Sequence, residues 1–397
     1  MWLLLLAFAV TPQTGLEEAK QICTEDAGRL WGKSLCGPFI LADSTTRRVY
    51  ANQADANGVL KQEGDLWTGT LPAGVGIANT ATEWSGTFWT MVGLPLPDDP
   101  ARRRRLLAHE MYHRIQNEVQ RAPRDATNEH LETEPGRVLL RLEFRALDAA
   151  LAAGGDDRRQ AVTDALAFRA ERWRLFPDAR RQETALEAGE GLAEYTGFAL
   201  DGLPLEKKIA AAREQLRAER PTYVRSFAYI SGPAWGLLLD DADPGWPRRI
   251  GVWVDLAQRV ADASQLKLDP LIAAERSLFY NAPAIRKEEA ARAKTIADRR
   301  ASYKARFIDG PTLKLTFTPK MSFTFNPNRV ETLPGEGTVY PTMEVSDEWG
   351  TLHVTGGALM GRSWESVRVP LAEEGKSWTL DLKPGWERKG NTVAPTR

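Results

Sequence analysis

The stretch from His109 to His113, HEMYH, combines residue types and a spacing that can do hydrolytic chemistry. On a helix, side chains four residues apart lie one above the other, so the two histidines can present imidazole nitrogens to one metal ion. Glu110 lies about 100° round the same turn and would face water on that ion. The pattern therefore predicts a metal site in which Glu110 acts as the general base. The alternative is an exposed helix that carries two histidines without a ligand role.

A third ligand must come from elsewhere in the chain, because a catalytic zinc ion usually has three protein ligands and keeps its fourth position for water. Six residues after His113 the chain has Val119, which disfavours the arrangement with a third histidine at that position. His130 is the only other histidine nearby and lies in the polar segment NEHLETE. It stays an alternative ligand, and the carboxylates further along the chain become the first candidates.

Four glutamates in the segment ETALEAGEGLAEYTG recur at helical spacing, and they are Glu183, Glu187, Glu190 and Glu194. Such a line of carboxylates repels itself unless it faces solvent, basic partners or a cation. Solvent is the expectation for Glu183. Glu190 differs, because a glycine flanks it on each side and glycine inside a helix costs about 1 kcal/mol relative to alanine. Close helix packing would explain these glycines, since a carboxylate oxygen must come to about 2.0–2.2 Å from a zinc ion.

HEMYH followed downstream by EGLAEY, at residues 190–195, resembles the gluzincin metallopeptidases. The likeness is strongest to their peptidase-MA-type branch, in which HExxH is paired with an E-G-x-A-x-Y helix. The resemblance implies that His109, His113 and Glu190 are the ligands of a zinc ion. It also implies that Glu110 is the general base.

The resemblance extends over about residues 85–260 and implies roles for residues around the ligands. Glu194 takes the position of an acidic residue that accepts the outer N–H of a ligand histidine and fixes its tautomer. The later stretch SFAYISGPAWGLLLD, at 226–240, is similar to the Y-x-x-G helix of that branch. Tyr229 on this helix is the first candidate to stabilise the oxyanion, and Tyr223 is the second. The alternative for either is a tyrosine of the core.

Two features depart from the family pattern. Glu190 comes long after His113, across a segment that we interpret as two inserted helices. The Trp-Leu pair expected before E-G is replaced by Glu187-Ala188-Gly189. Glu187 and Glu194 therefore stay alternative third ligands.

The elements that must position this site can be predicted from patterning. Asp98-Asp99-Pro100 predicts a helix start, and an apolar residue every fourth position from Leu107 to Val119 predicts that the helix packs into the domain. The preceding strand, 87–92, is placed to form a cleft edge on which an extended peptide adds main-chain hydrogen bonds, or else belongs to the sheet core. The arginines at 102–105 are expected on a solvated face, with anchoring of a substrate carboxylate as the alternative.

The chain as a whole predicts an α+β protein with a zincin-like metallopeptidase domain, a largely helical second half and a small C-terminal β-sandwich. Residues 11–121 are expected to form the β-rich part that ends in the HEMYH helix, 122–309 the helical part with the third ligand, and 310–397 the sandwich. Helices are expected at 16–31, 138–153, 159–176, 181–200, 205–218, 223–240, 246–263, 270–280 and 285–307. His353, in a sandwich strand, is expected to be a structural or surface histidine.

Composition describes an ordinary globular protein and limits its partners. Apolar residues make up 43% of the 397 and charged residues 26%, and the formal net charge of -1 argues against nucleic-acid and anionic-membrane partners. The thirteen Trp are attributed to interior packing before a binding groove. Residues 1–10, MWLLLLAFAV, predict a signal peptide too short to span a bilayer, and thus an exported protein, periplasmic or extracellular. Cys23 and Cys36 would suit a disulfide there, with two free thiols as the alternative.

These observations lead to one expected function and two alternatives. We expect an exported zinc metallopeptidase that acts on a peptide or protein substrate, without a membrane span once the signal peptide is removed. The alternatives are a peptide-binding or envelope-assembly protein without turnover, and a zinc hydrolase of a non-peptide amide. The sequence predicts no oligomeric state.

Overall fold

The computed structural model describes residues 10–72, 74–121, 126–325 and 330–396. The expected signal peptide, residues 1–10, lies outside the described residues apart from Val10. The chain divides into two compact units, Met1–Glu289 and Ala290–Arg397. The protein is of mixed α and β type, as its patterning predicts.

A six-stranded sheet forms the β part of the first unit. Its strands are β1 (Phe39–Asp43), β2 (Arg48–Ala51), β3 (Lys61–Glu63), β4 (Leu66–Thr70), β5 (Thr80–Trp84) and β6 (Thr87–Leu94), in the order β3-β4-β2-β1-β6-β5. β1 and β6 run parallel, with Phe39 opposite Thr90, and the other neighbours are antiparallel. β5 is therefore an edge strand of the sheet.

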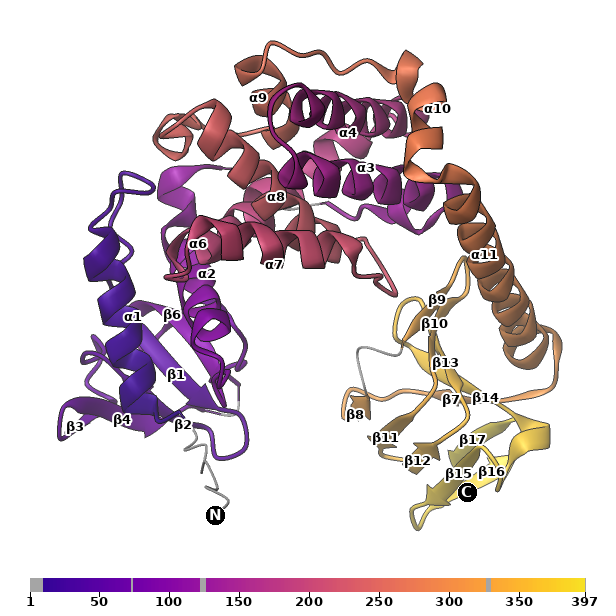
Figure 1. Ribbon diagram of the computed structural model, residues 1–397. Helices are drawn as coiled ribbons and strands as arrows, with labels where there is room; N and C mark the ends of the chain where they lie inside the picture. Colours follow the sequence, from indigo (N-terminus) through magenta and orange to yellow (C-terminus); the bar gives the residue numbers. More distant parts are fainter. Residues whose placement is uncertain (1–9, 73, 122–125, 326–329, 397) are drawn as a thin grey trace, which may run out of the picture. The chain divides into compact units, whose positions relative to one another are not determined.

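The centre of this sheet is buried on both faces, because successive side chains of a strand point to opposite sides. Phe39 and Leu41 of β1 belong to the large core formed with α1 (Pro12–Asp26) and α2 (Pro100–Val119), which lie alongside the sheet in Figure 1. Ile40 and Ala42 belong to a second apolar cluster on the other face. α2, the helix of the HEMYH motif, is thus fixed against the parallel centre of the sheet.

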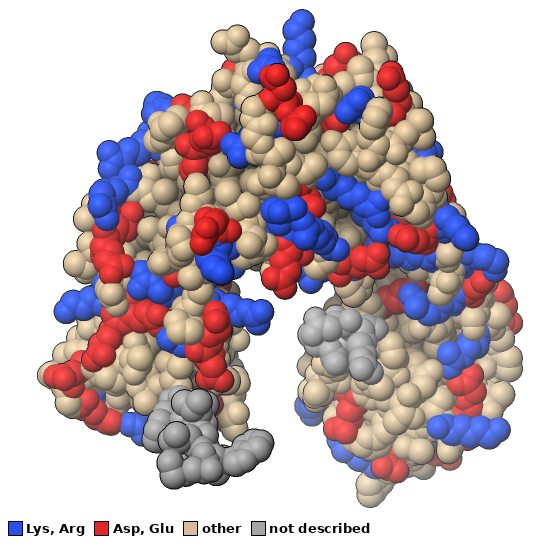
Figure 2. Space-filling view, viewed as in Figure 1, with Lys and Arg blue, Asp and Glu red and all other residues tan. Residues whose placement is uncertain are grey.

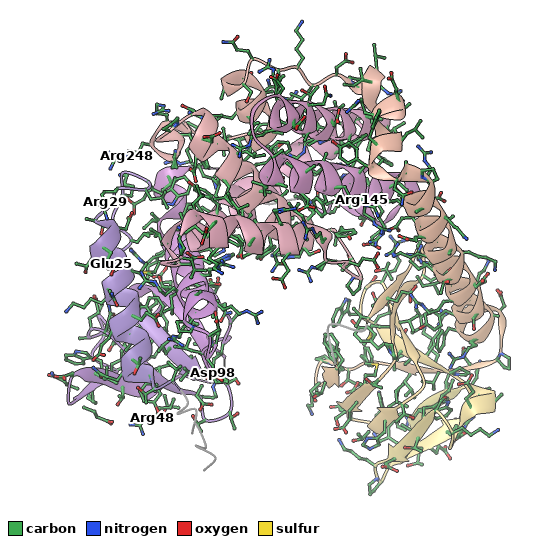
Figure 3. All side chains as sticks on the ribbon, viewed as in Figure 1. Glu25, Arg29, Arg48, Asp98, Arg145 and Arg248 are labelled. Carbon is green, nitrogen blue, oxygen red and sulfur yellow. A yellow bond between two sulfur atoms is a disulfide. The ribbon has the colours of Figure 1, made fainter. Side chains whose placement is uncertain are left out.

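The segment after α1 is tied down at several points. Cys23 and Cys36 form a disulfide, as expected. Between them, Trp31 is buried against Tyr112 of α2, with ring centroids 5.1 Å apart. Arg248 donates a hydrogen bond of 2.7 Å to the carbonyl oxygen of Arg29, which links this segment to a later turn (Figure 3). These contacts hold α1 beside the site helix.

Helices make up the rest of the first unit. They are the 3-10 turn Glu129–Glu132, α3 (Glu134–Ala152), α4 (Gly155–Leu175), α5 (Ala179–Leu186), the π-helical segment Glu187–Gly191, α6 (Leu192–Leu200), α7 (Leu205–Arg217), α8 (Ser226–Ala242), the 3-10 turn Trp246–Arg249, α9 (Leu256–Ala263), and a run of short helices over Pro270–Ile272, α10 (Ala273–Arg276) and Ser277–Tyr280. α11 (Ala282–Lys304) and the π-helical turn Ala305–Asp309 follow and cross into the second unit. The Gly232-Pro233 pair lies inside α8.

The helix predicted at 16–31 ends at Asp26, where Ala27 adopts a φ of +48°, and the helix predicted at 246–263 is wrong. The chain from 246 to 263 forms two separate pieces, because Gly251 adopts a φ of +67° and Asp255 then caps a new helix by accepting from the Gln258 backbone N–H. The break was not predicted because the apolar periodicity continues through Gly251 and Asp255, although Asp and Gly are common where helices begin or end.

The second unit carries two sheets. Its strands are β7 (Thr312–Thr316), β8 (Ser322–Phe325), β9 (Glu331–Leu333), β10 (Gly337–Tyr340), β11 (Met343–Asp347), β12 (Gly350–Val354), β13 (Ala358–Gly361), β14 (Ser366–Pro370), β15 (Trp378–Leu382), β16 (Trp386–Lys389) and β17 (Thr392–Pro395), with a 3-10 turn at Leu371–Glu373. Seven form a sheet in the order β16-β17-β7-β14-β13-β10-β9, and four a sheet in the order β15-β12-β11-β8. Both sheets contribute to one apolar cluster, as in two packed layers. His353 of β12 is part-exposed and lies 3.1 Å from Glu344.

Charge and hydropathy are those of an ordinary globular surface. Basic and acidic side chains lie interspersed over the face shown in Figure 2, in keeping with the formal net charge of -1. Within the described ranges, every helix is too short or too polar to cross a membrane.

Candidate metal centre

α2 holds the HEMYH residues on a rigid, buried helix. Asp99 caps its start by accepting from the Arg102 backbone N–H at 2.8 Å. The apolar positions predicted to anchor the helix are buried at Leu107, Met111 and Ile115. His109 and Glu110 are buried beside them and His113 is half-buried.

Glu190 is brought to the two histidines by the helical run 179–200. Its Oε2 atom lies 3.6 Å from Nε2 of His109 and 3.4 Å from Nε2 of His113. The two Nε2 atoms are 3.0 Å apart. Nitrogen and oxygen ligands at 2.0–2.2 Å from a tetrahedral zinc ion lie about 3.3 Å from one another. These three atoms therefore match the spacing of a ligand set, and the group can hold a metal ion.

Hydrogen bonds orient both imidazole rings toward this point. The Nδ1 atom of His109 is 2.9 Å from Oε2 of Glu194, the contact that the family resemblance implies. The Nδ1 atom of His113 is 2.9 Å from Oε1 of Gln116, a partner that the sequence reasoning missed. When each Nδ1–H donates to its oxygen, both Nε2 lone pairs are left for a metal ion. Gln116 could have been found from its place three residues after His113 on the same helix.

Two residues of the 222–229 region contact the ligand carboxylate. The Tyr229 hydroxyl donates to Oε2 of Glu190 at 2.5 Å, and its ring stacks on His109 with centroids 5.6 Å apart. Arg225, one turn earlier, donates to Oε1 of Glu190 at 3.0 Å. Arg225 was missed, although its spacing of four from Tyr229 could have placed it on the same helix face. Tyr223, the second oxyanion candidate, is buried elsewhere, under the guanidinium of Arg137 at 4.4 Å.

Glu110 lies beside the ligand set. Its Oε1 atom is 4.0 Å from Nε2 of His109, so the carboxylate lies beside the ligand set without joining it. Its buried Oε2 atom has no hydrogen-bond partner among the described residues. Burial raises the pKa of Glu110, although His109 and His113 partly offset this. A buried carboxylate oxygen without a partner among the described residues leaves a position that a water molecule can fill.

The charges around the histidines favour a cation. Burial lowers the pKa of His109, but the carboxylates of Glu190 and Glu194 outweigh it and raise the pKa to about 10. Burial alone would raise the pKa of Glu190, yet hydrogen bonds from His109, His113 and Tyr229 hold it well below the usual value. The two carboxylates thus favour positive charge at His109, which a divalent cation can supply in place of a proton.

A cleft of about 570 Å³ opens above the three ligands. Edge strand β5 lines it with Thr80 and Ala81, and β6 contributes Phe88, whose side chain is exposed. The strand predicted as the cleft edge, 87–92, is β6, which instead lies between β1 and β5. Strand 87–92 is therefore part of the sheet core, which is the alternative that the sequence left open, and the edge is β5, which the tight turn Ser85-Gly86 folds back along β6.

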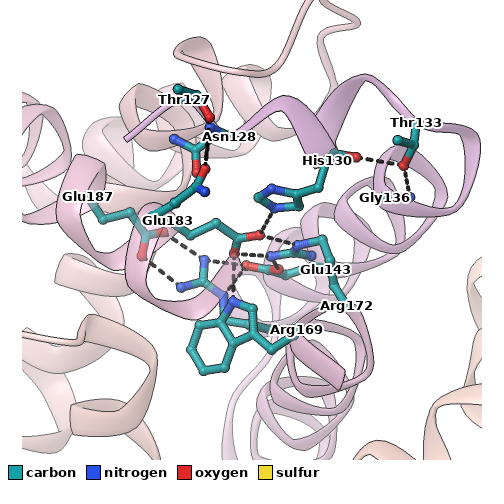
Figure 4. A network of polar contacts seen from close by, with 12 residues as sticks. Thr127, Asn128, His130, Thr133, Gly136, Glu143, Arg169, Arg172, Glu183 and Glu187 are labelled. Atoms are coloured by element: carbon teal, nitrogen blue, oxygen red, sulfur yellow. Dashed lines mark hydrogen bonds and ion pairs between the residues drawn. The ribbon is translucent and has the colours of Figure 1, made fainter. Parts of the chain in front are cut away.

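Two further glutamates of the predicted line, Glu183 and Glu187, belong to a buried ionic network (Figure 4). Glu187 pairs with Arg169, and Glu183 pairs with Arg172 and accepts from His130 at 2.6 Å. Glu143 of α3 bridges the two arginines. The expectation that Glu183 faces solvent is wrong, because α4 presents two arginines to this face. Glu187 and His130, both alternative ligands, are held here and do not reach the histidines.

The glycine after Glu190 permits close packing, as predicted. A Cβ atom on Gly232 of α8 would lie 2.4 Å from the Cα atom of Gly191, so the two backbones touch. At Gly189 the nearest atom to an added Cβ is Nε2 of Gln116 at 3.7 Å, an ordinary contact. Only one of the two flanking glycines therefore has a packing role.

The arginines at 102–105 are mostly ion-paired. Arg103 bonds Glu18 at 2.5 Å, Arg104 bonds Glu25 at 2.7 Å and Arg105 bonds Asp201 at 2.7 Å, while Arg102 is exposed. The solvated face predicted for this run is wrong for three of its four members, because α1 and the end of α6 supply acidic partners.

Comparison of the chain with protein-family models, with curated proteins and with solved structures finds no match.

Proposed function

We propose that the protein is an exported zinc-dependent metallopeptidase of gluzincin type, with a zincin-like first unit that hydrolyses peptide bonds. The observation that carries the proposal is the convergence of His109 Nε2, His113 Nε2 and Glu190 Oε2 beside the unpartnered carboxylate of Glu110. Two imidazoles and one carboxylate with room for water are a typical catalytic zinc set.

In the proposed hydrolysis, each residue of the site has a separate role. Zinc bound here would lower the pKa of a water molecule toward 7 and polarise a carbonyl group. Glu110 takes the proton of the attacking water and passes it to the leaving amine. The Tyr229 hydroxyl donates to Oε2 of Glu190 in this structure; a metal ion on Oε2 would replace that bond and leave the hydroxyl to donate to the oxyanion. Glu194 holds His109 in the tautomer that leaves Nε2 free.

The walls of the cleft favour an extended peptide over other amides. β5 is an edge strand, so the outward main-chain groups of Thr80 to Trp84 are open to pairing with a further strand. Phe88 offers an apolar contact for a substrate side chain. A hydrolase of a small amide would have no use for such an edge.

The proposal is tested by metal analysis and by digestion of a denatured-protein mixture with and without chelator. The expected result is one zinc per chain and cleavage that chelator abolishes and zinc restores. Glu190→Ala should lose most of the zinc, and Glu206→Ala, on the exposed face of α7, should keep it. Metal binding without chelator-sensitive cleavage would favour the peptide-binding alternative, and full zinc in Glu190→Ala would remove Glu190 from the ligand set.

Export is supported by the disulfide between Cys23 and Cys36 and by the apolar N-terminal residues. N-terminal sequencing of the mature protein after cell fractionation tests it, with cleavage near residue 10 as the expected result.

A further inference from the structure

The cleft contains one basic side chain that metal ligation leaves unexplained. Among the described residues that line it, Arg225 is the only Lys or Arg. Its side chain is 68% exposed and lines the cleft. An arginine presents five N–H donors, and the contact with Glu190 uses one of its nitrogens. Donors therefore remain for a ligand.

The contact with Glu190 is compatible with metal binding. The Oε2 atom of Glu190 faces the two histidines, and Arg225 contacts the other oxygen, Oε1. A metal ion on Oε2 would leave the Arg225 contact in place. The guanidinium would then be held beside the reacting centre.

The sequence suggested the arginines at 102–105 as an alternative anchor for a substrate carboxylate, but their positions exclude this role. Three of its members are ion-paired with acidic residues, and none of the four lines the cleft. Arg225 thus has no basic competitor among the described cleft residues.

We propose that Arg225 binds a carboxylate of the substrate and makes the site selective for peptides that carry one beside the scissile bond. The inference rests on the proposed peptidase function. Neighbouring Cα atoms are about 3.8 Å apart, so a carboxylate one residue from the scissile carbonyl lies within reach of a side chain that touches the ligand Glu190. Its source is a free C-terminus or the side chain of Asp or Glu, and guanidinium binds either with paired hydrogen bonds.

The test starts from peptides that the wild-type protein cleaves in a denatured-protein digest, identified by mass spectrometry. One cleaved peptide is made as the free acid and as the C-terminal amide, and with any adjacent Asp or Glu replaced by Asn or Gln. These forms are compared on wild type, Arg225→Gln, Arg225→Lys and the exposed control Arg102→Gln. Zinc content is measured for each protein.

Arg225→Gln should lower kcat/KM about 10- to 100-fold for the carboxylate form, and leave the neutral form within about threefold. Comparison of the free acid with the C-terminal amide, and of Asp or Glu with Asn or Gln, identifies which carboxylate Arg225 binds. Calorimetric binding of the same peptides to the Glu110→Gln protein, with and without Arg225→Gln, should give the same preference without turnover. Arg225→Lys should recover part of it, and Arg102→Gln should match wild type.

Three outcomes would overturn the inference. Equal losses on both peptide forms, or a loss of zinc, would make Arg225 a positioning residue for Glu190. Chelator-sensitive cleavage by wild type with no preference for a carboxylate would defeat the inference and leave the proposed function intact. Absence of any chelator-sensitive cleavage would overturn both.

Discussion

At the scale of single residues, a substitution of Glu110 should separate loss of catalysis from loss of zinc. Glu110→Gln keeps the side-chain shape but cannot take a proton, so kcat should fall about 10²- to 10⁴-fold. Zinc content should stay at the wild-type value, because Glu110 lies beside the ligands without joining them. Elemental analysis and peptide kinetics on the same preparation check both. Unchanged turnover with normal zinc would assign the base elsewhere.

The residues of the site also show how far the sequence could lead. The relative placement of His109, Glu110 and His113 could be predicted, because all three lie on one helix and the helical repeat fixes their spacing. The same holds for Glu190 and Glu194, which are four residues apart. The partners of Glu183 could not be predicted. Arg172, which holds it, comes from another helix, and local spacing does not say which helix will face it.

At the scale of elements, the approach of α8 to the Glu187–Gly191 segment positions the third ligand. Gly232→Ala would place a Cβ atom 2.4 Å from the Gly191 backbone, so one element must move. We expect a loss of about 1–3 kcal/mol in unfolding free energy and weaker zinc binding, since Glu190 moves with its segment. Gly189→Ala is the matched control, because its site is open, and it should be neutral or slightly stabilising. Chemical denaturation and zinc titration measure both; equal stability of the two variants would contradict the packing argument.

The hairpin that carries the cleft edge is anchored by Asp55. Its carboxylate accepts from the backbone N–H groups of Val59 and Leu60 and from the Ser85 hydroxyl in the β5–β6 turn. Burial raises the pKa of Asp55, but these bonds outweigh it and hold the pKa at about 2. The stabilisation is therefore full above the unfolded value of 3.8 and is lost as the pH falls toward 2.

Asp55→Asn should accordingly cost about 2 kcal/mol of unfolding free energy at pH 7, and most of the difference from wild type should disappear as the pH is lowered from 4 to 2. Denaturation curves at a series of pH values measure it. A difference that does not change with pH would mean that the charge of Asp55 contributes nothing.

The sequence predicted those properties of a helix or strand that depend on its own apolar pattern. It did not predict the properties that depend on packing or pairing with other elements. The α2 stripe at Leu107, Met111 and Ile115 predicted its burial correctly. The order of β5 and β6 could not be predicted from the pattern of either strand, because only the pairing of β6 with β1 decides that β5 is the edge. The π-helical segment at Glu187–Gly191 was likewise not predicted, because its sequence is also compatible with an α-helix that contains two glycines.

At the scale of the whole molecule, every residue of the candidate centre lies in the first unit, and the second unit has an apolar core of its own. Glu289, near the start of α11, is buried and pairs with Arg137 at 2.6 Å and Arg141 at 2.9 Å of α3. A chain that ends at Lys304 keeps this anchor and all three ligands. We therefore expect it to fold, to bind one zinc and to cleave short peptides at about the wild-type rate, because a compact unit with its own apolar core can fold alone.

The matched control for that truncation is the same chain ending at Leu278, which removes α11 and with it the Glu289 pairs. It should lose several kcal/mol, since removal of one partner leaves the buried charge of Arg137 uncompensated. Thermal unfolding, zinc stoichiometry and peptide kinetics on both truncations separate the outcomes. If the chain that ends at Lys304 binds zinc but cleaves only short peptides, the second unit contributes to binding of longer substrates. If it unfolds like the shorter chain, the two units are not independent folding units and the second core is needed to hold the first.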